Sequence, residues 1–102
     1  MSVLHIVNKS PYDRNSLDSC LRLALPGSAI LLIEDGVYAA RMPSSAADKL
    51  QQALGKHALY ALQADLQARG VGAESLIDGI HLVDYDCFVK LTTEYDKTQS
   101  WL

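Results

Sequence analysis

The sequence predicts an α/β protein, a three-layer α/β/α sandwich with a mainly parallel sheet of four or five strands. Two observations predict this class, and a third predicts the number of domains. Short apolar runs alternate about four times with stretches at helical spacing, which is the pattern of right-handed βαβ units around a parallel sheet. One run, residues 29–33, is continuously apolar, as expected for a central strand covered on both faces. The 102 residues contain no internal repeat or long linker, so we expect one domain over residues 1–102.

The first quarter of the chain is predicted to form a strand and a helix. Residues 3–7 are rich in β-branched side chains and run into a polar loop, which indicates the first strand. Asn15 or Ser16 caps the helix that follows, and Pro26-Gly27 ends it. The apolar side chains of this helix recur at helical spacing. They are Leu17, Cys20, Leu21 and Ala24.

The second strand, residues 29–33, is expected to lead into one helical turn over residues 37–41. A second helix then opens at Pro43-Ser44-Ser45, covers residues 46–54 and stops at Gly55.

The second half of the chain repeats this alternation. Residues 58–62 read as the third strand, and residues 64–69 as a third helix that Gly70 ends. Residues 80–83 read as the fourth strand and residues 87–92 as the last helix.

Composition excludes several classes of function. The net charge of −3 gives no electrostatic footprint for direct nucleic-acid binding. The start of the chain lacks the pattern of a signal peptide, and no apolar run approaches the roughly 20 residues that span a bilayer. We therefore expect a cytoplasmic protein with no membrane contact, in which Cys20 and Cys87 stay reduced.

Neither a cofactor nor a metal is expected. The loop after the first strand, residues 8–16, contains no glycine, and both dinucleotide and P-loop motifs need glycine where the backbone approaches phosphate. His5, His57 and His81 fall on separate elements without a metal-ligand spacing. Hydrogen-bonded positions in the sheet or at an interface suit these histidines better.

Four carboxylates follow predicted strands and could meet at one rim of the sheet: Glu34, Asp35, Asp84 and Asp86. Paired carboxylates can perform acid–base chemistry when their pKa values differ. The stronger interpretation assigns them to turns and caps, because Asp35-Gly36 is a turn signal and Asp84 or Asp86 can cap the last helix.

Cys20 is the best candidate for a nucleophile in this chain. One interpretation makes it a small apolar side chain on the buried stripe of its helix, since free cysteine is among the most buried residue types. The other makes it a reactive thiol whose pKa is lowered by the helix N-terminus and by Arg14 or Arg22. Cys87 is the weaker candidate, because the neighbouring Asp86 raises a thiol pKa.

Trp101 lies on an otherwise polar tail. It either packs against its own domain or anchors a partner.

Several segments together resemble the DsrH/TusB family. They are Leu4-His5-x-Val7-Asn8-Lys9-Ser10-Pro11, Leu31-Leu32-Ile33-Glu34-Asp35-Gly36-Val37-Tyr38-Ala39-Ala40, Tyr60-Ala61-Leu62-x-x-Asp65-Leu66-x-Ala68-Arg69-Gly70, Val83-Asp84-Tyr85-x-x-Phe88-Val89-x-Leu91-Thr92 and the terminal Trp101. The resemblance covers nearly the whole chain in order.

This resemblance implies a subunit of a cytoplasmic sulfur relay. Such complexes hold two copies each of three related chains, the other two being DsrE/TusD-like and DsrF/TusC-like. They pass persulfide sulfur to a small carrier, DsrC or TusE. The sulfur then serves dissimilatory sulfur oxidation or the 2-thiolation of the tRNA wobble uridine.

The resemblance also gives Cys20 a specific role to test. The principal relay cysteine lies on the DsrE/TusD-like subunit, but DsrH-like members carry a cysteine in the first helix, and Cys20 matches that position. The chain therefore looks closer to DsrH than to TusB. Two hypotheses stay open: Cys20 carries persulfide, or the chain is a non-catalytic docking subunit with an inert Cys20.

Overall fold

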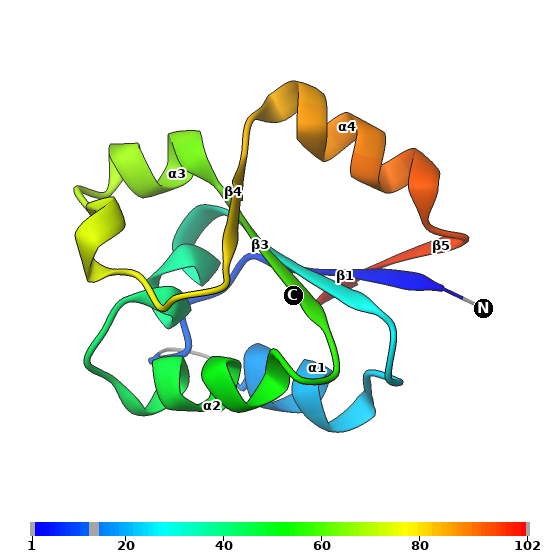
Figure 1. Cartoon of the computed structure of the whole chain (residues 1–102), viewed down its shortest axis with the longest axis horizontal. Helices are drawn as coiled ribbons and strands as arrows, with labels where there is room; N and C mark the ends of the chain where they lie inside the picture. The colour runs from blue at the N-terminus through cyan, green and yellow to red at the C-terminus, as the bar shows by residue number, and fades with distance from the viewer. Residues whose placement is uncertain (1, 13–14, 102) are drawn as a thin grey trace.

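A computed structural model describes residues 2–12 and 15–101. All five strands run parallel, in the order β4-β3-β2-β1-β5 (Figure 1). The elements are β1 (Val3–Val7), α1 (Ser16–Leu23), β2 (Ala29–Leu32), the 3-10 helix η1 (Glu34–Ala40), α2 (Ser45–Ala53), β3 (Ala58–Leu62), α3 (Gln63–Ala68), the 3-10 helix η2 (Ala73–Ser75), β4 (His81–Val83), α4 (Tyr85–Glu94) and β5 (Lys97–Trp101). The predicted fold class is confirmed.

The continuously apolar run lies at the centre of the sheet. All four residues of β2 are buried, between β1 and β3, with Leu4 beside Ala29 and Ala29 beside Ala58. A strand in this position meets side chains on both faces. That is why β2 shows no alternation of polar and apolar residues.

Local polar groups set where two of the helices begin. The Ser44 hydroxyl accepts a hydrogen bond from the Ala47 N–H at 3.0 Å at the start of α2. The Asp84 carboxylate accepts one from the Cys87 N–H at 2.8 Å at the start of α4. Each cap satisfies a backbone donor that has no partner within the helix.

The helices are shared unequally between the two faces of the sheet. The larger core cluster joins side chains of α1, α2 and α3 to one face, and the smaller joins α4 to the other. Figure 1 shows α1 and α2 on the side of the sheet opposite α4. Right-handed crossovers explain the division, because the first three connections step from β1 toward β4 and the last one returns past β1 to β5.

The C-terminal segment forms a strand that the sequence analysis read as a polar tail. Lys97–Trp101 pairs with β1 in parallel register, and Val7 lies beside Trp101. The Trp101 side chain packs against the larger core cluster, and its Nε1–H donates to His5 Nδ1 at 3.0 Å. Of the two positions considered for Trp101, the structure shows packing against its own domain.

His5 and Trp101 together should make the fold sensitive to acid. Indole N–H is a donor only, so His5 Nδ1 must accept and cannot also carry a proton. Burial and the nearby His57 both lower the pKa of His5. The unfolded chain therefore takes up this proton at a higher pH than the folded one. The free energy of unfolding should fall as the pH drops below about 6.5.

Urea unfolding between pH 5 and 7.5, followed by the fluorescence of the single tryptophan, measures this effect. His5→Gln keeps an acceptor without a titrating ring, so its stability should lose part of this acid dependence. Identical pH profiles for the two proteins would contradict the assignment.

Candidate functional site

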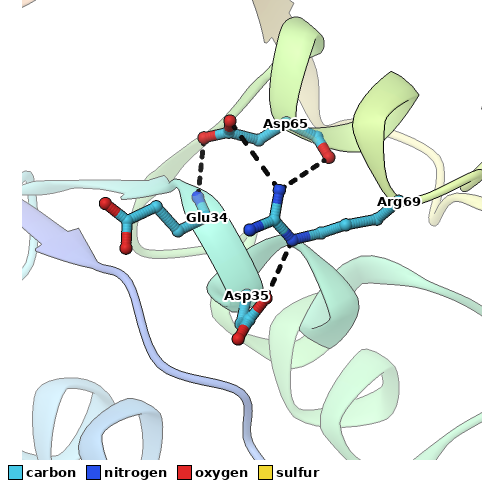
Figure 2. Close-up of polar contacts among 4 residues, drawn as sticks. All are labelled: Glu34, Asp35, Asp65 and Arg69. Atoms are coloured by element: carbon cyan, nitrogen blue, oxygen red, sulfur yellow. Dashed lines mark hydrogen bonds and ion pairs between the residues drawn. The ribbon is translucent and has the colours of Figure 1, made fainter.

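The carboxyl ends of parallel strands meet at one edge of the sheet, where α/β proteins place their ligands. At this edge the structure gathers four charged residues from η1 and α3: Glu34, Asp35, Asp65 and Arg69 (Figure 2). Glu34 and Asp35 were expected at this edge from the sequence. Asp65 and Arg69 were not expected as their partners, although both lie in the segment that carries the family resemblance.

Arg69 joins the two elements. Its Nε donates to Asp35 at 2.8 Å, and its Nη1 lies 3.8 Å from the Asp65 carboxylate and donates to the Asp65 carbonyl at 3.3 Å. The Asp65 carboxylate also accepts the backbone N–H of Glu34 at 2.7 Å. Glu34 has a positive φ of 49°, a conformation that few non-glycine residues adopt. The hydrogen bond from the Glu34 N–H to Asp65 therefore holds the chain in a sharp turn directly after β2.

Asp65 should matter more for stability than Asp35. Asp65→Ala removes the acceptor of a backbone N–H, and we expect a loss of about 1–2 kcal/mol in the free energy of unfolding. Asp35→Ala breaks only an exposed ion pair, and we expect about 0.5 kcal/mol. Urea titration of both variants gives the comparison. Equal losses would show that the turn does not depend on Asp65.

The two carboxylates at the start of α4 do not join this network. Asp84 caps the helix, and its hydrogen bonds with Cys87 lower the pKa of the Asp84 carboxyl. Asp86 is exposed in the first turn. The interpretation of Asp84 as a helix cap is confirmed, and Asp35 forms an ion pair rather than a carboxylate pair.

Cys20 lies on the inner side of α1 with an exposed fraction of 0%. It packs in the larger core cluster, together with Leu17. Burial raises the pKa of the Cys20 thiol to about 12, the opposite of the shift that activates a nucleophile. Of the two cations considered as its activators, Arg22 is exposed and Arg14 lies outside the described residues. In this chain alone, Cys20 has the environment of a core side chain.

Cys87 is the exposed thiol. It lines a shallow apolar hollow of about 190 Å³ between α4 and the sheet. The other lining residues are Tyr60, Val83, Lys90, Leu91 and Glu94.

The three histidines make separate structural contacts. His57 Nδ1 lies 3.2 Å from the Ser28 hydroxyl, and His5 accepts a hydrogen bond from Trp101. The His81 ring lies tilted beside the Tyr60 ring. Within residues 2–12 and 15–101, no three His, Cys, Asp or Glu side chains gather as a metal site would require. Over the same residues, no helix has the length and apolarity needed to cross a membrane.

These features define a small parallel α/β protein with one buried and one exposed thiol. Its fold matches the crystal structure of the ychN protein from E. coli, with a TM-score of 0.84 and 21% identity over 98% of both chains. MTH1491 from Methanobacterium thermoautotrophicum also shares the fold, with a TM-score of 0.73 and 19% identity over 96% of both chains.

The chain belongs to the DsrH-like family, whose model matches residues 9–98. It is 36% identical to Protein TusB of Pectobacterium parmentieri over 97% of this chain and all of that protein. It is 37% identical to Protein TusB of Salmonella dublin over 89% of this chain and 95% of that one. The resemblance noted from the sequence is confirmed at the level of the family. The preference for the DsrH branch rests on Cys20 and stays a prediction.

Proposed function

We propose that this chain is a subunit of a cytoplasmic, heterohexameric sulfur-relay complex that passes persulfide sulfur to a small carrier of the DsrC/TusE kind. The partners would be a DsrE/TusD-like and a DsrF/TusC-like chain, with two copies of each of the three. The end point is dissimilatory sulfur oxidation or 2-thiolation of the tRNA wobble uridine. Membership of the DsrH-like family over most of the chain supports this proposal.

One role for this subunit is to carry sulfur on Cys20. The Cys20 thiolate would attack the outer sulfur of a donor persulfide, forming Cys20–S–SH and releasing the donor as a thiolate. A partner thiolate would then attack that outer sulfur and restore the Cys20 thiolate. Both steps are exchanges that need no oxidant. They require a thiolate that the donor can reach.

The complete burial of Cys20 favours the second role, that of a non-catalytic docking subunit. A thiol with a pKa of about 12 is almost entirely protonated at neutral pH, and no donor sulfur reaches a side chain with no exposed surface. In this role Cys20 fills the core under α1. The chain then contributes contact surface to the complex, and the relay cysteine lies on another subunit.

Persulfide loading of the complete complex tests both roles. The three subunits would be produced together, treated with glutathione persulfide and mapped by mass spectrometry for added sulfur. The same experiment would be run with Cys20→Ser, and with Cys87→Ser as the matched control for the exposed thiol. Transfer to the purified carrier would be measured in each case.

Sulfur on Cys20, with transfer lost in Cys20→Ser but not in Cys87→Ser, would establish the relay role. Sulfur only on a partner subunit, with transfer intact in Cys20→Ser, would establish the docking role. Failure of the wild-type chain to assemble with the two partner chains would contradict the proposed function itself.

A further inference from the structure

The face of the sheet beneath α4 is only partly covered. Five strands at their usual spacing span about 19 Å, and packed helices lie about 10 Å apart, so this face has the width of two helices. Over the described residues, α4 is the helix whose side chains pack there. Parallel sheets are normally covered on both faces, and this sheet therefore has space for about one more helix.

The exposure of the side chains shows where that space lies. Leu4 and Ala29, near the amino ends of β1 and β2, are fully buried. Ile6 and Ile33, near the carboxyl ends, belong to the same cluster but are only half-buried. On the neighbouring edge strand, Ser100 lies beside Ile6 and is exposed. Leu31, beside Ile6 in the register, is fully buried, so the less covered area is limited to Ile6, Ile33 and the edge strand β5.

One side of α4 carries apolar side chains that the sheet does not bury. Leu91 is buried and Phe88 is half-buried against the sheet. Tyr85 and Val89 lie one helical turn apart on one side of α4, with exposed fractions of 60% and 62%. We call Ile6, Ile33, Tyr85, Phe88 and Val89 the α4 surface.

The segment that carries α4 has a net negative charge. Residues 84–97 carry four carboxylates and two lysines, and Glu34 adds another exposed carboxylate directly after Ile33. A second copy of this chain would bring the same net negative charge against it, which disfavours self-association through this surface. A partner with basic residues on either side of an apolar stripe complements it.

We propose that the α4 surface binds an amphipathic helix with basic flanks from a different protein chain, which lies alongside α4 over β5 and the carboxyl end of β1. The inference rests on the proposed function in one respect: the helix would then belong to another subunit of the complex. The chemistry of the surface can be tested without that complex.

A model peptide tests the surface on the free chain. We would titrate the isotope-labelled full chain with a Leu/Lys amphipathic peptide of about 14 residues, roughly 21 Å long as a helix, and follow backbone NMR shifts. A Leu/Glu peptide of the same pattern is the charge control. The Leu/Lys peptide should shift the amides of the α4 surface and bind at least tenfold more tightly than the Leu/Glu peptide.

Two variants sharpen this test. Val89→Asp should weaken peptide binding at least tenfold, whereas Leu23→Asp, at a helical residue of the same 62% exposure on α1, should leave it unchanged. Asp86→Lys should weaken binding of the Leu/Lys peptide and reduce its salt dependence. Shifts centred elsewhere, or equal binding by Val89→Asp, would overturn the proposal.

The three-subunit preparation separates the two proposals. If the wild-type chain assembles and Val89→Asp does not, the helix comes from a subunit of the complex. If both assemble equally well, the α4 surface has no role there and the inference fails while the proposed function stands. If the wild-type chain alone forms a dimer that Val89→Asp abolishes, a second copy occupies the surface and the inference is wrong.

Discussion

Cys20 of the folded, isolated chain should be almost inert toward thiol reagents. At pH 8 we expect it to react with an aromatic disulfide at least about a thousandfold more slowly than an ordinary accessible cysteine. The reason is a pKa of about 12 against an ordinary value of 9.0, which lowers the thiolate fraction about a thousandfold. Complete burial acts in the same direction, because the reagent reaches the thiol only when the chain opens.

The chain contains two cysteines, which makes the measurement direct. Under native conditions one thiol should titrate rapidly, and mass mapping should place it at Cys87. In denaturant both should titrate, and Cys87→Ser should show no rapid phase when folded. Rapid labelling of Cys20 in the native protein would mean that α1 opens readily, and this would restore Cys20 as a candidate sulfur carrier. Slow labelling in the free chain but rapid labelling in the complex would assign that opening to a partner.

The order of strands and helices could be predicted because it depends on local patterns. The apolar run of β2 and the Gly70 stop of α3 are visible in neighbouring residues. The burial of Cys20 also follows from its spacing with Leu17. β5 could not be recognised in this way, because its first four side chains are exposed. Backbone pairing with β1 and the packing of Trp101 hold it in the sheet.

The charged network at the carboxyl edge was not predictable from spacing. Asp35 and Arg69 are 34 positions apart, and only the right-handed crossover from β2 to β3 brings η1 and α3 together. From the sequence alone, Asp35 was a turn residue and Arg69 the end of a helix. Their contact is a consequence of topology, as is the unequal cover of the two faces that leaves the α4 surface open.

Gly36→Ala, in the first turn of η1, should be strongly destabilising for a substitution of a single methyl group. The Asp35-Gly36 pair was interpreted from the sequence as a turn signal, but the structure shows a packing reason for glycine at position 36. Gly36 is buried, and a Cβ at this position would overlap the backbone carbonyl of Val7. That carbonyl cannot move freely, because its oxygen accepts the Ile33 N–H at 3.0 Å. Relieving the overlap would therefore pull Val7 of β1 away from Ile33, the residue that follows β2.

We expect Gly36→Ala to lower the free energy of unfolding by about 2–3 kcal/mol, which corresponds to a fall in Tm of roughly 10 °C or more. Gly55→Ala is the matched control, because a Cβ at Gly55 meets no atom within 4 Å and should change stability by less than about 1 kcal/mol. Thermal and urea unfolding of both variants measure the difference. A Gly36→Ala protein as stable as Gly55→Ala would show that the turn after β2 can shift away from Val7. The backbone at Glu34, which Asp65 holds by a hydrogen bond, would then be able to move. The carboxyl edge of the sheet would be flexible at this point.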